Sequence, residues 1–127
     1  FMKNQDNLSK IIKIAKLKLE IDKKENWSKG SSTYLEEIKK ELIEVEDELK
    51  LGKQIYIEDE LGDVLWDYLN LLINLESENK IKVENVFERS RKKYFERING
   101  INNGISWNEI KTKQKLELFE QHQKFNF

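Results

Sequence analysis

One stretch of this sequence is rich in carboxylates but contains no cation that could neutralise them. The segment between Lys53 and Lys80 has no lysine or arginine, although these two residue types fill 23 of the 127 positions. Its acidic residues are Glu58, Asp59, Glu60, Asp63, Asp67, Glu76 and Glu78. On a helix such charges are normally compensated by a lysine or arginine about one turn away. Because the segment supplies none, the compensation must come from outside it, and a divalent metal ion bound by oxygen ligands can provide it.

The elements that must position these acids are helices. The sequence has no proline and is rich in lysine, glutamate and leucine, which favours long helices. Apolar periodicity, a capping box formed by Thr33 and Glu36, and a C-terminal cap at Gly52 set the expected boundaries. The expected helices cover residues 8–24, 33–51, 57–75 and 83–99, with a loop at 100–106 and a short helix from 107 toward 119. We therefore predict an all-α fold, a four-helix-bundle-like core with a short C-terminal helix.

Length and composition narrow the class of protein. We treat residues 1–127 as a single domain, with 113–127 as a candidate mobile tail and Phe1, which precedes Met2, as an extraneous residue. A net charge of −1 argues against general binding to nucleic acids or anionic membranes. The absence of cysteine excludes thiolate metal sites and disulfides. No apolar run is long enough to span a membrane, so we expect a cytoplasmic protein.

Polar residues share one face of the expected helix at 57–75. At 100° per residue, Glu60, Asp63, Asp67 and Asn70 fall within an arc of about 80° on an otherwise apolar helix. Gly62 lies between Glu60 and Asp63 in the sequence, and because a glycine in mid-helix costs about 1 kcal/mol relative to alanine, we expect a backbone or a ligand to approach closely there. The remaining acids of the segment are expected to be solvated residues at the helix ends.

A second acidic stripe runs along the expected helix at 33–51. Its members are Glu37, Glu41, Glu44 and Glu48. By itself this stripe is also typical of a solvated face, with Lys39 and Lys40 as partners. If the two helices pack as antiparallel neighbours, however, one i,i+3 pair from each helix converges. The converging residues are Glu41, Glu44, Glu60 and Asp63. Four such carboxylates repel one another unless a cation lies among them, and their hard oxygen atoms suit Mg²⁺ or Mn²⁺.

These motifs resemble a known family. Glu41-Leu-Ile-Glu44 followed by Glu60-Leu-Gly-Asp63 is similar to the signature of the MazG-type nucleoside triphosphate pyrophosphohydrolases, Glu-x-x-Glu on one helix and Glu-x-x-Asp on the next. The resemblance implies an all-α, Mg²⁺-dependent enzyme that cleaves the α–β phosphoanhydride of a nucleotide to give a monophosphate and pyrophosphate. It also implies that these four acids are the metal-binding and catalytic residues, and that Asn70 contacts the substrate.

The resemblance extends toward both ends of the chain, from about residue 8 to 112. Trp27 and Lys29 match a tryptophan-containing loop, Lys93-Tyr94 with Arg97 matches Lys-Phe-x-x-Arg, and Trp107 with Lys111 matches a closing Trp-x-x-x-Lys. The resemblance implies that these residues bind the substrate and that the protein is a homodimer or homotetramer. The sequence departs from the family at Lys40, where the family doubles the glutamate, and at residues 31–33 of the loop, so the preferred base stays open.

Other functions remain compatible with the sequence. A non-catalytic helical interaction protein would explain the heptad-like apolar seam of the helix at 33–51. A related pyrophosphohydrolase could use the same acids on phosphoribosyl-ATP, dUTP or dCTP. A diiron carboxylate bundle is excluded because it needs Glu-x-x-His pairs, and the only histidine, His122, lies far from the acids. The sequence does not single out one carboxylate as the general base.

Overall fold

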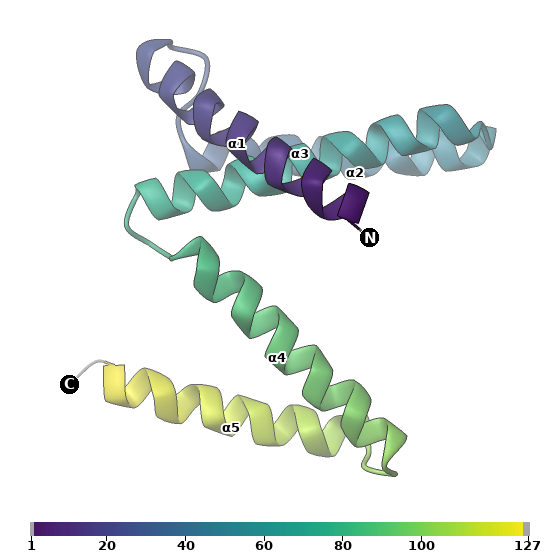
Figure 1. The fold of residues 1–127 in the computed structure, drawn as a ribbon, viewed down its shortest axis with the longest axis vertical. Coiled ribbons are helices and arrows are strands. Elements are labelled where there is room, and N and C mark those ends of the chain that lie inside the picture. The colour runs from purple at the N-terminus through teal and green to yellow at the C-terminus, as the bar shows by residue number, and fades with distance from the viewer. Residues whose placement is uncertain (1, 126–127) are drawn as a thin grey trace. The chain divides into compact units, whose positions relative to one another are not determined.

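The computed structural model describes residues 2–125 and contains five helices (Figure 1). They are α1 (Met2–Lys24), α2 (Ser31–Leu51), α3 (Gln54–Ser77), α4 (Val83–Asn102) and α5 (Trp107–Phe125). The prediction of an all-α fold is confirmed. The last helix is not short: it has 19 residues and includes most of the expected tail. Phe1 and residues 126–127 lie outside the described residues.

Two compact units make up the chain, and each is described by itself. The first comprises Phe1–Val83 and the second Glu84–Phe127. None of the helices within residues 2–125 is both long enough and apolar enough to cross a membrane.

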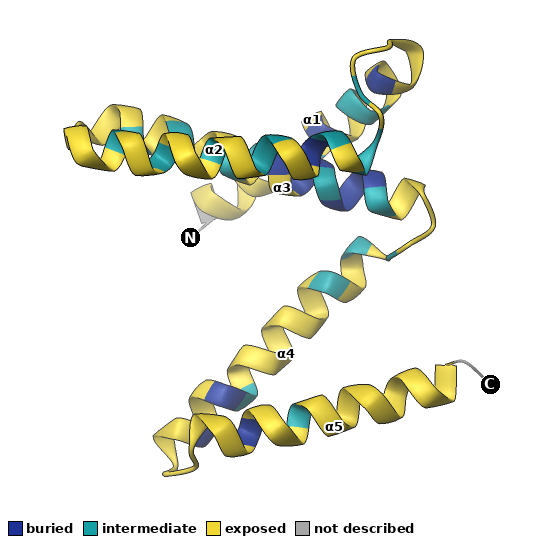
Figure 2. Cartoon of the chain, turned by 180° about the vertical axis from the view of Figure 1, so that it is seen from behind, coloured by how far each residue is buried: buried dark blue, intermediate teal, exposed yellow. Residues whose placement is uncertain are grey.

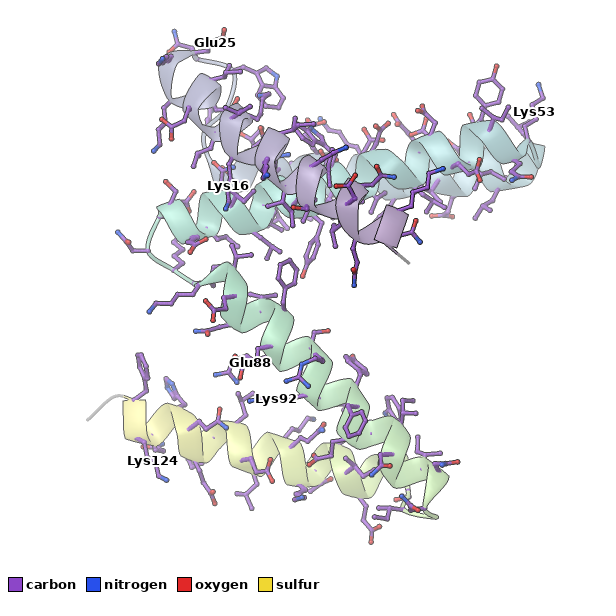
Figure 3. All side chains as sticks on the ribbon, viewed as in Figure 1. Lys16, Glu25, Lys53, Glu88, Lys92 and Lys124 are labelled. Atoms are coloured by element: carbon purple, nitrogen blue, oxygen red, sulfur yellow. The ribbon has the colours of Figure 1, made fainter. Side chains whose placement is uncertain are left out.

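In the first unit α2 and α3 lie side by side and antiparallel, and α1 packs across α3 (Figure 1). The buried core forms where α1 crosses the pair (Figure 2). It consists of Ala15, Leu69 and Ile73, against which Ile11, Ile12, Leu19 and Trp66 pack. Lys53, the N-cap residue of α3, stands at the opposite end of the pair, at the turn between α2 and α3 (Figure 3). The cation-free segment therefore runs back from this turn along α3 toward the core.

The two ends of α2 are held differently from each other. Gly52 adopts the left-handed conformation with φ 71° and donates its backbone N–H to Glu48 O at 3.0 Å, which confirms the expected C-cap. The expected capping box at the other end is wrong, because α2 begins two residues before Thr33 and Gly30 is its N-cap. The Thr33 hydroxyl instead accepts a hydrogen bond from the Lys29 backbone at 2.8 Å.

A glutamate from the far end of α3 caps α2. Glu78 Oε2 accepts a hydrogen bond from Ser31 N at 2.8 Å, and Oε1 accepts one from Ser31 Oγ at 2.7 Å. Gly30 has φ 93°, and a Cβ atom there would lie 2.7 Å from Glu78 Oε2, so the position requires glycine. Glu78 is exposed at the end of α3, as expected, but its carboxylate also joins the end of α3 to the start of α2.

In the second unit α5 turns back along α4 after the loop at 103–106. Arg97 is 6% exposed and donates from Nε to Gln114 Oε1 at 2.8 Å. Gln114 in turn donates to Lys93 O at 3.0 Å. Gly100 faces the buried Ile110, and a Cβ atom there would lie 2.1 Å from Ile110 Cδ1. The hairpin is thus closed by both polar and apolar contacts. Along the exposed side of α4, Glu88 and Lys92 form an ion pair one turn apart (Figure 3).

Candidate functional site

Carboxylates from α2 and α3 converge within the first unit. Oxygen atoms of Glu41, Glu60 and Asp63 all lie within 4.8 Å of one another. Glu41 and Glu60 are half-buried between the helices, and Asp63 is exposed. The antiparallel packing brings them together because one i,i+3 pair on each helix faces the other helix. Glu44, the fourth residue of the sequence prediction, lies at the edge of this group, where its charge raises the pKa of Glu60 and Asp63.

The pKa values of the converging acids are raised, which shows that it is unfavourable for all of these carboxyl groups to be ionised at the same time. Burial, and then the neighbouring carboxyl groups of Glu44 and Glu60, raise the pKa of Glu41 to about 8. Burial also raises the pKa of Glu60 and of Asp63, with Asp59 as the next cause for Asp63. A positive charge placed among these groups would reverse all of these shifts.

Two of the converging oxygen atoms have no partner. Glu41 Oε2 and Glu60 Oε2 are fully enclosed, and neither makes a hydrogen bond to any described residue. A buried acceptor left without a donor costs free energy. The donor set consists of carboxylate oxygen only, which is the ligand type that Mg²⁺ and Mn²⁺ prefer. The residues present therefore fit a hard divalent cation.

The polar stripe on α3 continues beyond the acids into the buried part of the helix. Asp67 is 6% exposed and Asn70 is fully enclosed. Asp67 Oδ2 and Asn70 Oδ1 also have no hydrogen-bond partner among the described residues. Burial, then Glu37 and Asp63, raise the pKa of Asp67 to about 6. Both residues lie on the polar stripe of α3 that was predicted from the sequence, and the structure shows that the stripe is buried at Asp67 and Asn70.

Asn74 lies on the same stripe of α3, although it was not predicted from the sequence. It is 3% exposed and donates from Nδ2 to Asn70 O at 2.7 Å. Its position seven residues after Asp67 puts it on the same helix face, and this spacing could have identified it.

A further polar cluster joins α1 to the start of α2. Asp22 is buried and accepts hydrogen bonds from the Tyr34 hydroxyl and the Lys18 ammonium group. Lys18 Nζ also lies 4.5 Å from the centre of the Trp27 ring, and the Trp27 and Tyr34 rings meet edge to face at 5.8 Å. Trp27 was predicted from the sequence as a site residue, whereas Lys18, Asp22 and Tyr34 were not. The sequence does contain a signal for this cluster, because Asp22 is a carboxylate at a position of α1 where the helical periodicity predicts an apolar residue.

Four of the predicted substrate-binding residues belong to the second unit. The structure brings Arg97 and Trp107 together, with the guanidinium 5.0 Å from the centre of the tryptophan ring and 5.3 Å from that of Tyr94. Lys93 and Lys111 are exposed, as is Lys29 in the first unit. Arg97 is thus enclosed by two aromatic rings and Gln114, a structural role that its spacing from Lys93 did not reveal.

Comparison with known proteins agrees with this arrangement of acids. A family model, the MazG nucleotide pyrophosphohydrolase domain, matches residues 29–101, which is more than half of the chain. The matched region contains α2, α3 and nearly all of α4, and with them all four converging acids. No curated protein and no solved structure gave a significant match. The chain therefore belongs to the MazG nucleotide pyrophosphohydrolase domain family.

Proposed function

We propose that this protein is a Mg²⁺-dependent pyrophosphohydrolase that cleaves the α–β phosphoanhydride of a ribo- or deoxyribonucleoside triphosphate, or of a related nucleotide. Its products would be a nucleoside monophosphate and pyrophosphate. Family membership supports the class of reaction. The observation that carries the metal dependence is the convergence of Glu41, Glu60 and Asp63, with two enclosed carboxylate oxygens that have no donor.

The residues that would hold the metal are the four converging acids, Glu41, Glu44, Glu60 and Asp63. When bound, Mg²⁺, or Mn²⁺ in its place, supplies Lewis-acid polarisation of the phosphate oxygens and lowers the pKa of water. The acids themselves are negatively charged and repel the negatively charged nucleotide. We therefore expect the nucleotide to bind poorly to the metal-free protein.

The attacking water must lose a proton, and we propose that Glu44 accepts it. Its side chain is exposed and lies outside the tight group formed by Glu41, Glu60 and Asp63. Its carboxylate can therefore take a proton without giving up an enclosed position. Glu44→Gln should accordingly lower kcat far more than it weakens Mg²⁺ binding.

The substrate-binding residues implied by family resemblance are Trp27, Lys29, Asn70, Lys93, Arg97, Trp107 and Lys111. Lys93 and Lys111 have exposed ammonium groups that can pair with phosphate oxygens. Trp27 is half exposed, so one face of its ring can stack on a base. Arg97 donates from Nε to Gln114, which leaves its terminal N–H groups as the ones that can pair with a phosphate.

The protein is also proposed to assemble into a homodimer or homotetramer. Leu35, Leu42 and Leu49 recur at intervals of seven residues along α2, and they are 45%, 50% and 57% exposed. Leu61 and Leu65 on α3 are 49% and 44% exposed. Apolar stripes of this kind on neighbouring helices are typical of surfaces that are covered in an assembly.

The decisive experiment is incubation of the protein with a panel of nucleotides, with and without Mg²⁺, and identification of the products by phosphorus NMR. Release of pyrophosphate that requires Mg²⁺ would support the proposal. Release of orthophosphate would rule out attack at the α–β linkage. Absence of turnover on every nucleotide would favour the alternative, a non-catalytic helical interaction protein.

A further inference from the structure

We propose that Asp67 and Asn70 read the base of the substrate and select nucleotides whose base carries an exocyclic amino group. This inference rests on the function proposed above, and it names the substrate class for that site. The structural basis is a pair of buried hydrogen-bond acceptors that the protein leaves without donors.

The two unpartnered atoms of this pair are both hydrogen-bond acceptors. Asp67 Oδ2 and Asn70 Oδ1 are enclosed and have no partner among the described residues. Asn70 Nδ2 donates one of its two N–H groups to Trp66 O at 2.9 Å. A ligand that satisfies both atoms must therefore bring two N–H or O–H groups to this point of α3.

A donor close to Asp67, the Tyr34 hydroxyl, serves another residue. Tyr34 on α2 lies close enough for the charge of Asp67 to raise its pKa, yet its hydroxyl donates to Asp22. Lys18 donates to Asp22 and to the Tyr34 hydroxyl. The other charged groups that face Asp67 are acids, Glu37 and Glu44 from α2 and Asp63 from α3 itself. Electrostatics here disfavours an anionic ligand and favours a neutral or positive donor.

Asp67 is not part of the proposed metal group. The carboxylates that lie within 4.8 Å of one another are those of Glu41, Glu60 and Asp63, without Asp67. Along α3, Asp67 is four and Asn70 is seven residues beyond Asp63, which corresponds to about 6 Å and about 10 Å of helix rise. A nucleotide whose phosphates lie at Asp63 has its ribose and then its base beyond them. The direction of the stripe therefore leads from the phosphates to the base.

An exposed aromatic ring lies against Tyr34. The Trp27 ring meets Tyr34 edge to face at 5.8 Å and is 55% exposed. A base stacked on Trp27 would have its edge directed toward the neighbourhood of Tyr34 and Asp67. Because the two acceptor atoms are enclosed, the base reaches them only if the covering side chains rotate, and two new hydrogen bonds would offset the cost of that rotation.

An amino group is the part of a base that matches this pair. The –NH₂ group of cytosine, adenine or guanine has two N–H bonds and can donate to two acceptors at once. Uracil and hypoxanthine have a carbonyl oxygen at the position equivalent to the amino group of cytosine and adenine. This oxygen cannot donate, and the single N–H of the adjacent ring nitrogen can pair with only one of the two acceptors. Sites built on buried hydrogen bonds reject analogues that lack the matching group.

The test compares nucleotides that differ in this group and in the hydrogen on the adjacent ring nitrogen. The pyrophosphate released by the intact protein in Mg²⁺ is measured for CTP against UTP and for ATP against ITP. We expect kcat/KM to be at least about tenfold higher for the amino member of each pair. Asp67→Asn, which replaces an acceptor by a donor, should bring both ratios close to one while turnover still requires Mg²⁺. Glu76→Gln, which removes an exposed acid from the same helix, should leave both ratios unchanged.

The outcomes separate this inference from the proposed function. Pyrophosphate release with equal kcat/KM within each pair would overturn the base-reading pair and leave the proposed function standing. A preference for UTP and ITP would overturn it as well. If Asp67→Asn lowers turnover of both members equally, Asp67 serves catalysis and not selection. If no nucleotide yields pyrophosphate, the proposed function itself fails.

Discussion

Glu78 Oε2, just beyond the end of α3, lies 2.8 Å from Ser31 N, the first residue of α2. This hydrogen bond and the one from Ser31 Oγ hold the pKa of Glu78 below its ordinary value. The contact closes the α2–α3 pair at the end opposite to the Gly52 turn. Both ends of the pair are thus held, and the acids between them are kept in register.

Glu78→Gln should therefore destabilise the first unit. The amide would lose the charge–dipole interaction with the N-terminus of α2, and we expect the free energy of unfolding to fall by about 1 kcal/mol. Urea unfolding followed by circular dichroism measures this change. Glu76→Gln, two residues earlier and exposed, is the matched control and should have no effect. Equal stability of the two variants would show that the cap is not needed.

Removal of a single one of the proposed metal-binding acids should abolish turnover without unfolding the protein. Glu60→Gln and Asp63→Asn are each expected to lower kcat/KM by more than about 100-fold, because even residues outside the ligand shell of a metal typically cost about 10- to 100-fold. Helix content, measured by circular dichroism, should stay the same. Mg²⁺ binding followed by calorimetry should weaken in both variants. Full activity in either one would move the metal site elsewhere.

The metal-free protein should become less stable as the pH rises from about 5 to about 8. The folded protein keeps the Glu41 proton up to a pKa of about 8, whereas in the unfolded chain this group has its ordinary value of 4.5. Unfolding between these values releases a proton, so a higher pH favours the unfolded state. Asp67, with its pKa raised to about 6, acts in the same direction.

Thermal unfolding across this pH range, with and without Mg²⁺, measures the effect. Because a bound cation favours the ionised carboxylates, the increase in Tm on adding Mg²⁺ should grow with pH. Glu41→Gln should flatten the pH dependence of the metal-free protein. A Tm that rises between pH 5 and 8 in the absence of Mg²⁺ would contradict the assigned pKa shifts.

Two glycines within helices should respond to alanine in opposite ways. A Cβ atom at Gly62 would meet nothing within 4 Å, so the expected close approach of a backbone is wrong, and Gly62→Ala should stabilise the protein by about 1 kcal/mol. At Gly100 a Cβ atom would lie 2.1 Å from Ile110 Cδ1, and Gly100→Ala should cost about 1–3 kcal/mol. Chemical denaturation of the two variants provides the comparison. If Gly62→Ala is stable but inactive, the space beside Gly62 belongs to a ligand.

The apolar stripe of α2 should control assembly. Leu42→Glu places a charge in the middle of this stripe and should shift the protein to a lower oligomeric state, measured by light scattering after size-exclusion chromatography. Leu17→Glu on α1 makes the same change at a residue that is 65% exposed and should leave the mass unchanged. A monomeric wild-type protein would refute the proposed homo-oligomer.

Local patterns in the sequence were sufficient for the order of the helices and for the two acidic stripes. Helix periodicity, the absence of proline and Gly52 are properties of neighbouring residues, and the five helices they predict are observed, although each is longer than expected. Glu60, Asp63, Asp67 and Asn70 share a face because of helix geometry alone. The convergence of this stripe with Glu41 also followed, since a connection as short as the one between α2 and α3 allows little but antiparallel packing.

Contacts between residues far apart in the chain were decided only by the tertiary structure. Glu78 looked like a solvated acid because its partner, Ser31, lies 47 residues earlier. Arg97 looked like an available cation, but α5 supplies Gln114 and Trp107 to enclose it. Burial at the end of the polar stripe likewise depends on how α1 crosses α3. A sequence determines which side chains share a helix face, but which groups lose water and which find a partner depends on packing between helices.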